Sequence, residues 1–484
     1  MSQPAPAVRP AAPLSSIPIA DRPGPVKWVQ LVLFVAVFLF AMLCEHGTQL
    51  LLFPLSFSPK TRPLYEEGIA YTKLAFGRNL CLISQLFAPS RIVVSFSDES
   101  GRYLDPELFV VRAPGAYNSG AGRITKLNLP ERSVLISNHQ IYLDWLYLWL
   151  IAYYAELADA VHIVLKASLK WTPIVGPAMQ FYNFIFMHRK WDEDKKNLSD
   201  QLAILAEKSK PYSSHTSVAS SVDAARREGS PNKLLFLIFP EGTLVSEESR
   251  PGSKKYADKI GQPDCRNMVL PRSTGLFFCL RTLAADIADL KLIDMTIGYP
   301  GIPPAGTGQK YYTLRSVYMD GVPPPNVHVH ITISRISSFI AGGSDSPPLG
   351  KLPKSARDSP KTLPTDEEKQ MFEAWLLRRW RKKDDLMDRF YKDGDFVGGA
   401  FAQTAAAGEY RRPEVIRLES APNGEAPAKA AKKESLSSGK TGEMKWVEIP
   451  AELQSPIELG HVFCWFAPVF ALYYAYKVVR FLTG

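Results

Sequence analysis

Six short apolar runs constrain the fold most strongly, because each ends in polar residues, glycine or proline. The runs lie at 90–98, 132–139, 161–168, 182–191, 233–243 and 292–300. Their length and their content of β-branched and aromatic residues predict β-strands. Segments with apolar residues at helical spacing, such as 143–155 and 194–210, lie between them. Strands that alternate with helices predict an α/β fold with a largely parallel sheet flanked by helices.

Composition and charge favour a large folded part with anionic partners. The chain has 484 residues, 46% of them hydrophobic, which is enough for a sizeable core. A net charge of +9 favours phosphorylated substrates, a lipid surface or nucleic acid. Nucleic acid lacks support, because no zinc-ligand spacing, aromatic-basic pattern or heptad array accompanies the charge. The five cysteines are scattered and odd in number, which indicates free thiols in a reducing compartment.

A strongly apolar region at 27–57 precedes the first predicted strand. Residues 28–44 are nearly all apolar, and five mixed residues separate them from a second apolar run at 50–57. About 20 apolar residues span a bilayer, whereas roughly 10 to 14 indicate an interfacial or re-entrant piece. We therefore expect the first run to be a membrane anchor and the second to be shallow or re-entrant. A cleaved signal peptide is the alternative, but no small-x-small cleavage site follows the run.

A second membrane segment is predicted at 457–482, near the C-terminus. This stretch is mostly apolar but contains His461 and Pro468, so a buried amphipathic helix is the rival interpretation. The basic residues on the two sides of the first apolar region are too balanced to predict which side of the membrane holds the folded domain.

Three other parts have compositions typical of disorder or linkers. Residues 1–26 are rich in proline and alanine, residues 213–231 form a serine- and alanine-rich loop, and residues 401–447 form a long linker. Between the last two, a basic amphipathic helix is predicted at 365–393. Its start carries the capping-box residues Thr365 and Glu368, and its basic side chains could face anionic headgroups or solvent.

The run at 132–139 ends in a histidine that has an aspartate five residues further on. On one continuous helix, His139 and Asp144 would lie about 140° apart and could not easily touch. If His139 lies in a loop and Asp144 in the first helical turn, the carboxylate can bond to one imidazole nitrogen. The other nitrogen can then act as a base. Such a pair is weak evidence by itself, because a histidine at a strand end is more often a satisfied polar residue.

Two further run ends could bind an anion. In the segment Phe239 to Thr243 (FPEGT), Gly242 allows a left-handed backbone, and successive N–H groups there could form an anion-binding nest. Arg189 follows the run at 182–191, where its guanidinium could bind a phosphate as a fork. An ordinary turn and a surface arginine are the alternatives.

In this order and at these spacings, the segments resemble the glycerolipid acyltransferase family, which includes lysophosphatidic acid acyltransferases. The corresponding motifs are Asn138-His139-x4-Asp144, Phe186 to Arg189, Phe239 to Thr243, and Ile293 to Pro300. The resemblance covers about Leu135 to Pro300, and the sequence LPRSTG at Leu270 to Gly275 is typical of the eukaryotic lysocardiolipin and lysophosphatidylinositol branch. The chain departs from the family at Asn183, where many members have a glycine.

The resemblance implies a glycerolphosphate-acyltransferase-like catalytic domain at 90–340. As it implies, His139 removes a proton from a lysophospholipid hydroxyl, which attacks the thioester of acyl-CoA, and Asp144 orients and stabilises the histidine.

The same resemblance implies a substrate-binding set of Arg189, Glu241, Gly242 and Thr243. Arg189 and the backbone of Gly242 and Thr243 would hold the phosphate of the acceptor. A carboxylate repels phosphate, so Glu241 is more plausible as a residue that fixes the loop or bonds to Arg189.

The expected reaction makes a diacyl phospholipid, with lysophosphatidic acid as the first acceptor and lysophosphatidylinositol or lysocardiolipin as rivals. No cofactor is expected beyond acyl-CoA as co-substrate, and the expected partners are the lipid substrate and a bilayer, with the endoplasmic reticulum as location. A non-catalytic membrane scaffold and a CoA-independent transacylase remain as alternatives. No metal site is expected, because the pair His328 and His330 has no third ligand nearby and favours packing or hydrogen bonding.

Overall fold

The computed structural model describes the chain in seven stretches and a few residues near its end. The described residues are 13–23, 27–113, 122–188, 190–209, 233–336, 346–406, 445–464, 473, 476, 477, 479 and 480. The loop predicted at 213–231 and half of the segment predicted at 457–482 therefore lie outside the described residues.

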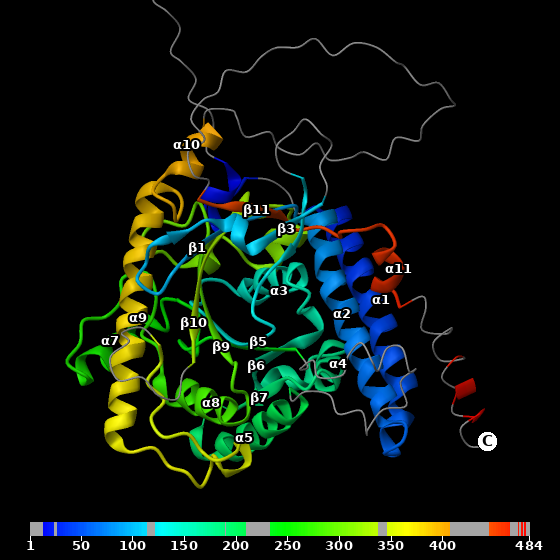
Figure 1. Cartoon of the computed structure of the whole chain (residues 1–484). Coiled ribbons are helices and arrows are strands. Elements are labelled where there is room, and N and C mark those ends of the chain that lie inside the picture. The colour runs from blue at the N-terminus through cyan, green and yellow to red at the C-terminus, as the bar shows by residue number, and fades with distance from the viewer. Residues whose placement is uncertain are drawn as a thin grey trace, which may run out of the picture.

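A nine-stranded sheet forms the centre of the described part (Figure 1). Its order is β11-β1-β10-β9-β5-β8-β6-β7, with β2 paired to β1. The strands are β1 (Arg91–Ser97), β2 (Tyr103–Leu104), β5 (Arg132–Ser137), β6 (Val161–Lys166), β7 (Ile185–Met187), β8 (Leu234–Ile238), β9 (Lys291–Gly298), β10 (Asn326–Arg335) and β11 (Val447–Pro450). The strands from β9 to β7 run parallel, whereas β10 is antiparallel to β9. The predicted α/β fold is confirmed, and each of the six apolar runs supplies a strand.

Helices cover both faces of this sheet, and a small separate sheet pairs β3 (Val110–Arg112) with β4 (Ile124–Leu127). The α-helices are α1 (Trp28–Leu52), α2 (Arg62–Phe87), α3 (Asp144–Tyr154), α4 (Val175–Phe181), α5 (Trp191–Lys208), α7 (Arg250–Lys259), α8 (Ser273–Asp286), α9 (Asp366–Asp393), α10 (Ala400–Ala406) and α11 (Glu458–Val462). Shorter helical turns are η1 (Leu14–Ser16), η2 (Ile19–Asp21), η3 (Phe53–Phe57), η4 (Pro106–Phe109), η5 (Ala158–Ala160), η6 (Ala167–Trp171), η8 (Gly308–Lys310), η9 (Arg315–Met319) and η10 (Ala356–Asp358).

The alternation of side chains along each strand builds two hydrophobic cores. Along β5, Leu135 packs into the core shared with α2 and α3, while Val134 and Ile136 pack into the core shared with α5, α8 and α9. Because both faces are covered, the central strand β8 is apolar along its whole length. Figure 1 shows α9 on one flank of the molecule and the pair α1 and α2 on the other.

The N-terminal apolar region is one continuous helix and not two separate segments. The mixed residues at 45–49 do not interrupt α1, because Glu45 and Gln49 are buried there and find hydrogen-bond partners. Glu45 accepts a bond from Asn79 of α2 at 3.5 Å, and Gln49 donates one to the backbone oxygen of Ala178 at 3.4 Å. Within the described residues, the helical stretch Trp28–Phe57 alone is long and apolar enough to span a membrane, with a mean hydropathy of 2.2.

Part of the segment predicted to be disordered at 1–26 is ordered. Residues 13–23 form η1 and η2 and lie against the loop after β9. Arg22 donates a hydrogen bond to the backbone oxygen of Ile17 at 2.9 Å and another to that of Tyr311 at 2.5 Å. Composition alone did not reveal these contacts, because the partner lies almost 300 positions away along the chain.

The linker predicted at 401–447 is shorter than expected, because regular structure extends into both ends of this range. The carboxylate of Asp395 accepts bonds from four backbone N–H groups at 2.8–3.1 Å and so caps α10, whose Phe401 is buried against Val93. At the other end, Val447 begins β11, which pairs with β1. Residues 407–444 lie outside the described residues.

The helix predicted at 365–393 is present as α9, but its basic side chains do not all face outward. The capping box of Thr365 and Glu368 is present. Arg379 and Lys383 are buried and form ion pairs with Asp294 of β9. These two residues are therefore unavailable to anionic headgroups.

Candidate active site

One edge of the sheet collects the predicted catalytic segments. Because β5, β8 and β9 are parallel, their carboxyl ends lie at the same edge. β5 leads into His139, β8 leads into the segment 239–243, and β9 leads into Tyr299. The carboxyl edge of a parallel sheet is the usual place for a ligand site in an α/β fold.

His139 and Asp144 form the expected pair. His139 lies in the loop after β5 and Asp144 is the first residue of α3, so the two side chains meet with Nδ1 and Oδ2 2.8 Å apart. The imidazole is 18% exposed, whereas the carboxylate is fully buried. The imidazole also stacks on Phe239, with ring centroids 4.2 Å apart. Since Nδ1 faces the carboxylate, Nε2 is the nitrogen available to accept a proton.

The carboxylate of Asp144 is held by three further donors. Its Oδ2 accepts the backbone N–H groups of Gln140 at 2.6 Å and Ile141 at 3.0 Å. Its Oδ1 accepts the hydroxyl of Tyr299 at 2.6 Å. These bonds fix the position of the carboxylate and satisfy a charge that burial would otherwise destabilise.

Tyr299 is a site residue that the sequence did not single out. It lies within the apolar segment that the family resemblance included, but nothing in that pattern distinguishes it from a core aromatic residue. Burial, together with the charge of Asp144, holds the pKa of Tyr299 well above its usual range. The hydroxyl therefore remains a donor to Asp144.

The buried side chain of Glu241 fixes the loop that carries His139. Its side chain is 2% exposed, and its two oxygens accept the backbone N–H groups of His139 at 3.1 Å and Val269 at 3.3 Å. Burial raises the pKa of Glu241 to about 8, although the two hydrogen bonds act in the opposite direction. Both oxygens are engaged with backbone groups, so a direct contact between Glu241 and a substrate is not made in this arrangement.

Asn138 anchors the start of the loop 138–143 between β5 and α3, which carries His139 and which we call the catalytic loop. Its buried side chain donates to the backbone oxygen of Ile297 at 3.0 Å and accepts the N–H of the same residue at 2.8 Å. The amide thus takes the place of a peptide group and continues the pairing of β5 with β9 beyond the last strand residue. His139 then leaves the sheet from a fixed point.

Gly242 and Thr243 form the turn after β8. Gly242 has a φ of +69°, which favours glycine, and its N–H bonds to the oxygen of Phe239 at 3.0 Å within the turn. That N–H is therefore used, contrary to the prediction that it is free to bind an anion. The side chain of Arg272 passes beside the turn, with Cδ 3.7 Å from the place where a Cβ of Gly242 would lie.

Arg272 is a second residue that the sequence did not assign to the site, although the LPRSTG segment that contains it was noted. Its backbone N–H bonds to the oxygen of Pro240 at 2.8 Å, which holds the segment against the FPEGT turn. Its side chain is exposed. The pairing of two distant segments could not be inferred from either one alone.

Arg189, predicted to bind phosphate, lies outside the described residues. Its neighbours His188 and Lys190 are held by Asp194, whose carboxylate accepts their backbone N–H groups at 2.8 Å and 3.1 Å. They follow β7, which ends at the same edge of the sheet as β6 and β8.

No group of three or more metal-ligating side chains occurs among the residues that the structure describes. His328 bonds to Asn326 at 2.9 Å, and His330 bonds to Ser95 and Ser97 at 2.8 Å and 2.9 Å. Burial lowers the pKa of His328 to about 4 and that of His330 to about 3. Both histidines are hydrogen-bonded, as the sequence interpretation favoured, and their lowered pKa values make them neutral at pH 7.

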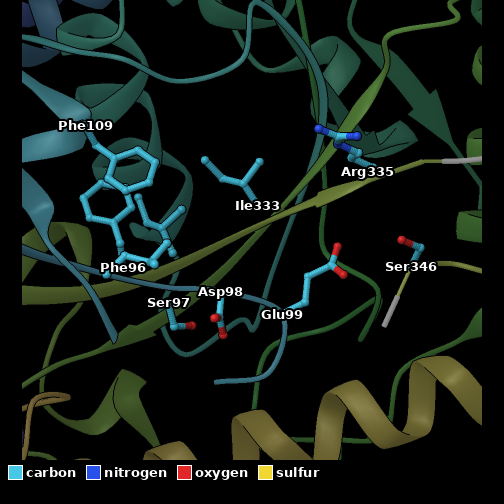
Figure 2. A pocket seen from close by; sticks show the side chains of 10 residues that line it. Phe96, Ser97, Asp98, Glu99, Phe109, Ile333, Arg335 and Ser346 are labelled. Carbon is cyan, nitrogen blue, oxygen red and sulfur yellow. The ribbon is translucent and has the colours of Figure 1, made fainter. Parts of the chain in front are cut away.

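A cavity of about 440 Å³ lies away from His139 and Asp144 (Figure 2). Its walls include Phe96 of β1, Phe109, and Ile333 and Arg335 of β10. β10 runs antiparallel to β9, and β1 is parallel to β10, so this cavity lies at the opposite edge of the sheet from His139. It is not part of the candidate active site.

Two family descriptions match the chain. Residues 123–299 match the family described as Acyltransferase. This range includes the loop of His139, the FPEGT turn and Tyr299. Residues 356–418 match the family described as Acyltransferase C-terminus, which includes α9. No solved structure matches the chain.

Curated proteins similar to the chain include three with named activities. The 2-acyl-1-lysophosphatidylinositol acyltransferase of Saccharomyces cerevisiae is 36% identical over 283 residues, which are 56% of this chain and 64% of that protein. The probable 1-acyl-sn-glycerol-3-phosphate acyltransferase 5 of Arabidopsis thaliana is 30% identical over 271 residues, 56% of each chain. Lysocardiolipin acyltransferase 1 of Danio rerio is 29% identical over 262 residues, 54% of this chain and 53% of that protein. The chain thus spans between half and two thirds of the length of these relatives.

Proposed function

Because the chain belongs to the glycerolipid acyltransferase family, in the branch of the lysophosphatidylinositol and lysocardiolipin acyltransferases, we propose that it transfers an acyl chain from acyl-CoA to a lysophospholipid hydroxyl. The observation that carries the proposal is the pair of His139 and Asp144, joined at 2.8 Å at the carboxyl edge of the sheet. A histidine whose other ring nitrogen is bonded to a buried carboxylate is equipped to act as a general base.

In the proposed reaction, Nε2 of His139 removes the proton from the acceptor hydroxyl as its oxygen attacks the thioester carbonyl. The new C–O bond forms, and the tetrahedral intermediate then breaks its C–S bond. The proton passes from His139 to the departing CoA sulfur, so the histidine returns to its neutral state without an acyl-enzyme. Asp144 stabilises the imidazolium between the two steps. No cofactor takes part, because acyl-CoA is a co-substrate.

The phosphate of the acceptor binds beside the FPEGT turn in this proposal. Arg272 lies next to Gly242 and presents a guanidinium that can form paired hydrogen bonds to phosphate oxygens. The backbone of Thr243 and the side chain of Arg189 complete the anion site that the family resemblance implies. Gly242 contributes through the left-handed backbone that forms the turn, because its own N–H is used within the turn.

Lysophosphatidylinositol is the acceptor that we put first. The sequence motifs placed lysophosphatidic acid ahead, but the yeast relative named for lysophosphatidylinositol shares 36% identity with this chain over 283 residues. Lysophosphatidic acid is the second candidate, supported by the Arabidopsis relative named for that activity.

A membrane location, at the endoplasmic reticulum, completes the proposal. α1 exposes many large apolar side chains, and 22% of its most apolar stretch is buried within the protein. These exposed residues include Trp28, Val29, Val32, Leu33, Phe40, Leu43, Leu50 and Leu51. Exposed apolar surface of this extent along one helix favours contact with lipid. An enzyme held in a bilayer meets its lipid acceptor there.

The experiment that tests this function is an acyl-transfer assay with the purified full chain in mixed micelles. Labelled oleoyl-CoA is supplied with lysophosphatidylinositol, lysophosphatidic acid or lysocardiolipin in separate reactions. A parallel reaction contains a labelled diacyl phospholipid as donor and no acyl-CoA. We expect transfer from oleoyl-CoA, fastest to lysophosphatidylinositol.

Each other outcome overturns a defined part of the proposal. Fastest transfer to lysophosphatidic acid would leave the reaction but reverse the order of acceptors. Transfer only in the reaction without acyl-CoA would identify a transacylase. No transfer in any reaction would favour a scaffold that has kept the fold.

A further inference from the structure

The buried face of α9 is hydrogen-bonded to a loop that carries no proposed catalytic residue. Asp384 of α9 is 6% exposed, and its two oxygens accept the backbone N–H groups of Arg266 and Asn267, each at 2.8 Å. A buried carboxylate that accepts two backbone N–H groups holds that backbone in one position. The segment 264–270, which we call the bracing loop, is therefore fixed to α9.

Asn267 connects the bracing loop to the catalytic loop. It is 1% exposed, and its side chain donates to Asp388 of α9 at 2.8 Å and accepts the N–H of Ala305 at 3.1 Å. Its backbone oxygen accepts the side-chain N–H of Gln140 at 3.0 Å. Gln140 directly follows His139, and its own backbone N–H bonds to the carboxylate that orients the histidine.

A second route runs from the bracing loop through Glu241. One oxygen of Glu241 accepts the N–H of Val269 in the bracing loop, and the other accepts the N–H of His139. The backbone of the proposed base is thus held on both sides, at its own N–H and through the side chain of the next residue.

α9 also forms ion pairs and a hydrogen bond with β9, the strand that anchors the catalytic loop. Arg379 bonds to Asp294 of β9 at 3.0 Å, and Lys383 bonds both to Asp294 and to the backbone oxygen of Met295, each at 2.5 Å. All three side chains are no more than 7% exposed. Two residues further along β9, Ile297 forms its double hydrogen bond with Asn138.

We infer that α9 is part of the catalytic unit, and that Asp384 and Asn267 are positioning residues for the His139 loop. The inference rests on the proposed function and assigns a role to the region that matches the C-terminal family description. Neither residue touches the reacting groups, so both act through Gln140 and Glu241. Since a displacement of about 1 Å can cost about a hundredfold in rate, loosening this brace lowers kcat and leaves the acceptor KM nearly unchanged.

The test compares Asp384→Asn and Asn267→Ala with Glu373→Gln in the full chain. Asp384→Asn keeps the shape of the side chain but presents an amide NH2 to one of the two N–H groups. Asn267→Ala is milder, because it leaves both N–H bonds to Asp384 in place. Glu373 is the control, since it lies on the same helix and accepts a bond from Tyr256 of α7 at 2.6 Å, away from the bracing loop.

We expect kcat to fall roughly tenfold to a hundredfold in Asp384→Asn, less in Asn267→Ala, and not in Glu373→Gln. Hydrogen exchange of the amides at 138–144 should quicken in the first two variants only. A purely structural role would lower the melting temperature while the kcat of the folded fraction and the exchange at 138–144 stay native, and that result overturns the inference. If Asp384→Asn does not fold, Asn267→Ala decides on the same criteria.

The exchange measurement also separates the two levels of the account. If the native chain transfers no acyl group, the proposed function fails, but the exchange rates still report whether α9 braces the loop. If the native chain is active and both variants keep native kcat and exchange, the function stands and the positioning role is wrong.

Discussion

One hydroxyl group distinguishes the environment of Asp144 from that of an ordinary helix-capping aspartate. Tyr299 donates to Oδ1 at 2.6 Å, and the interaction is fully buried. In Tyr299→Phe, the carboxylate loses a donor that no water can replace without new space. We expect kcat to fall about tenfold, because a hydrogen bond to a buried charged group is worth about 1.5–3 kcal/mol and 1.4 kcal/mol corresponds to a factor of ten.

The matched control is Tyr154→Phe on α3, whose buried hydroxyl bonds to the backbone oxygen of Glu452 at 3.4 Å instead of to the site. Steady-state kinetics of both variants check the prediction. Equal kcat in the native chain and Tyr299→Phe would show that the other three bonds to Asp144 suffice.

Arg272 is predicted to act on acceptor binding and not on the chemical step. In Arg272→Ala, we expect the KM for the lysophospholipid to rise about tenfold, since one charge-assisted contact to phosphate is lost, while kcat changes much less. Arg335→Ala removes an exposed arginine at the opposite edge of the sheet and serves as the control (Figure 2). A larger loss in kcat than in KM would place Arg272 elsewhere in the mechanism.

Asn183 shows how a departure from the family pattern can be compatible with the fold. Its φ is +55°, in the left-handed region that glycine adopts most easily and asparagine next. The position therefore needs a residue that tolerates this backbone, and asparagine does. The sequence revealed the substitution but not the backbone angle that explains it.

At the scale of elements, the short helix η8 packs against the catalytic loop at a glycine. A Cβ on Gly308 would lie 2.5 Å from the backbone oxygen of Gln140, which cannot move without shifting His139. We expect Gly308→Ala to lower kcat at least tenfold, since the added methyl displaces backbone of the loop. Gly252→Ala on α7, where a Cβ meets nothing within 4 Å, is the control and should keep native kcat. Native kcat in Gly308→Ala would mean that η8 shifts to accommodate the methyl group and that the catalytic loop stays in place.

The strands and the catalytic loop could be predicted because their signals are local. An apolar run, its polar end and the start of the next helix all lie within a few positions, as in the passage from β5 through His139 to Asp144. α2 was missed, since its buried face mixes apolar residues with Thr72, Lys73 and Asn79. The inward turn of Arg379 and Lys383 was also missed, because it depends on a buried aspartate about 85 positions earlier.

At the scale of the whole molecule, the burial of Glu241 couples folding to pH. The pKa of Glu241 is raised to about 8 in the folded chain, from about 4.5 when exposed. Its contribution to the free energy of unfolding is therefore complete below about pH 4.5 and is lost as the pH rises through about 8. We expect the melting temperature of the native chain to fall more steeply between pH 5 and pH 9 than that of Glu241→Gln, which does not titrate. Parallel slopes in a thermal melt series would contradict the raised pKa.

The two matched family regions form one working unit, since α9 closes over the same sheet whose edge carries the site (Figure 1). The central claim is that His139 is the base for acyl transfer within that unit. The most direct measurement is the rate of transfer from labelled oleoyl-CoA to a lysophospholipid by the native chain, His139→Ala and His461→Ala, at equal amounts of folded protein. The account predicts native rates for His461→Ala and a loss of at least a thousandfold for His139→Ala, about the contribution of a general base. A native rate in His139→Ala would contradict it.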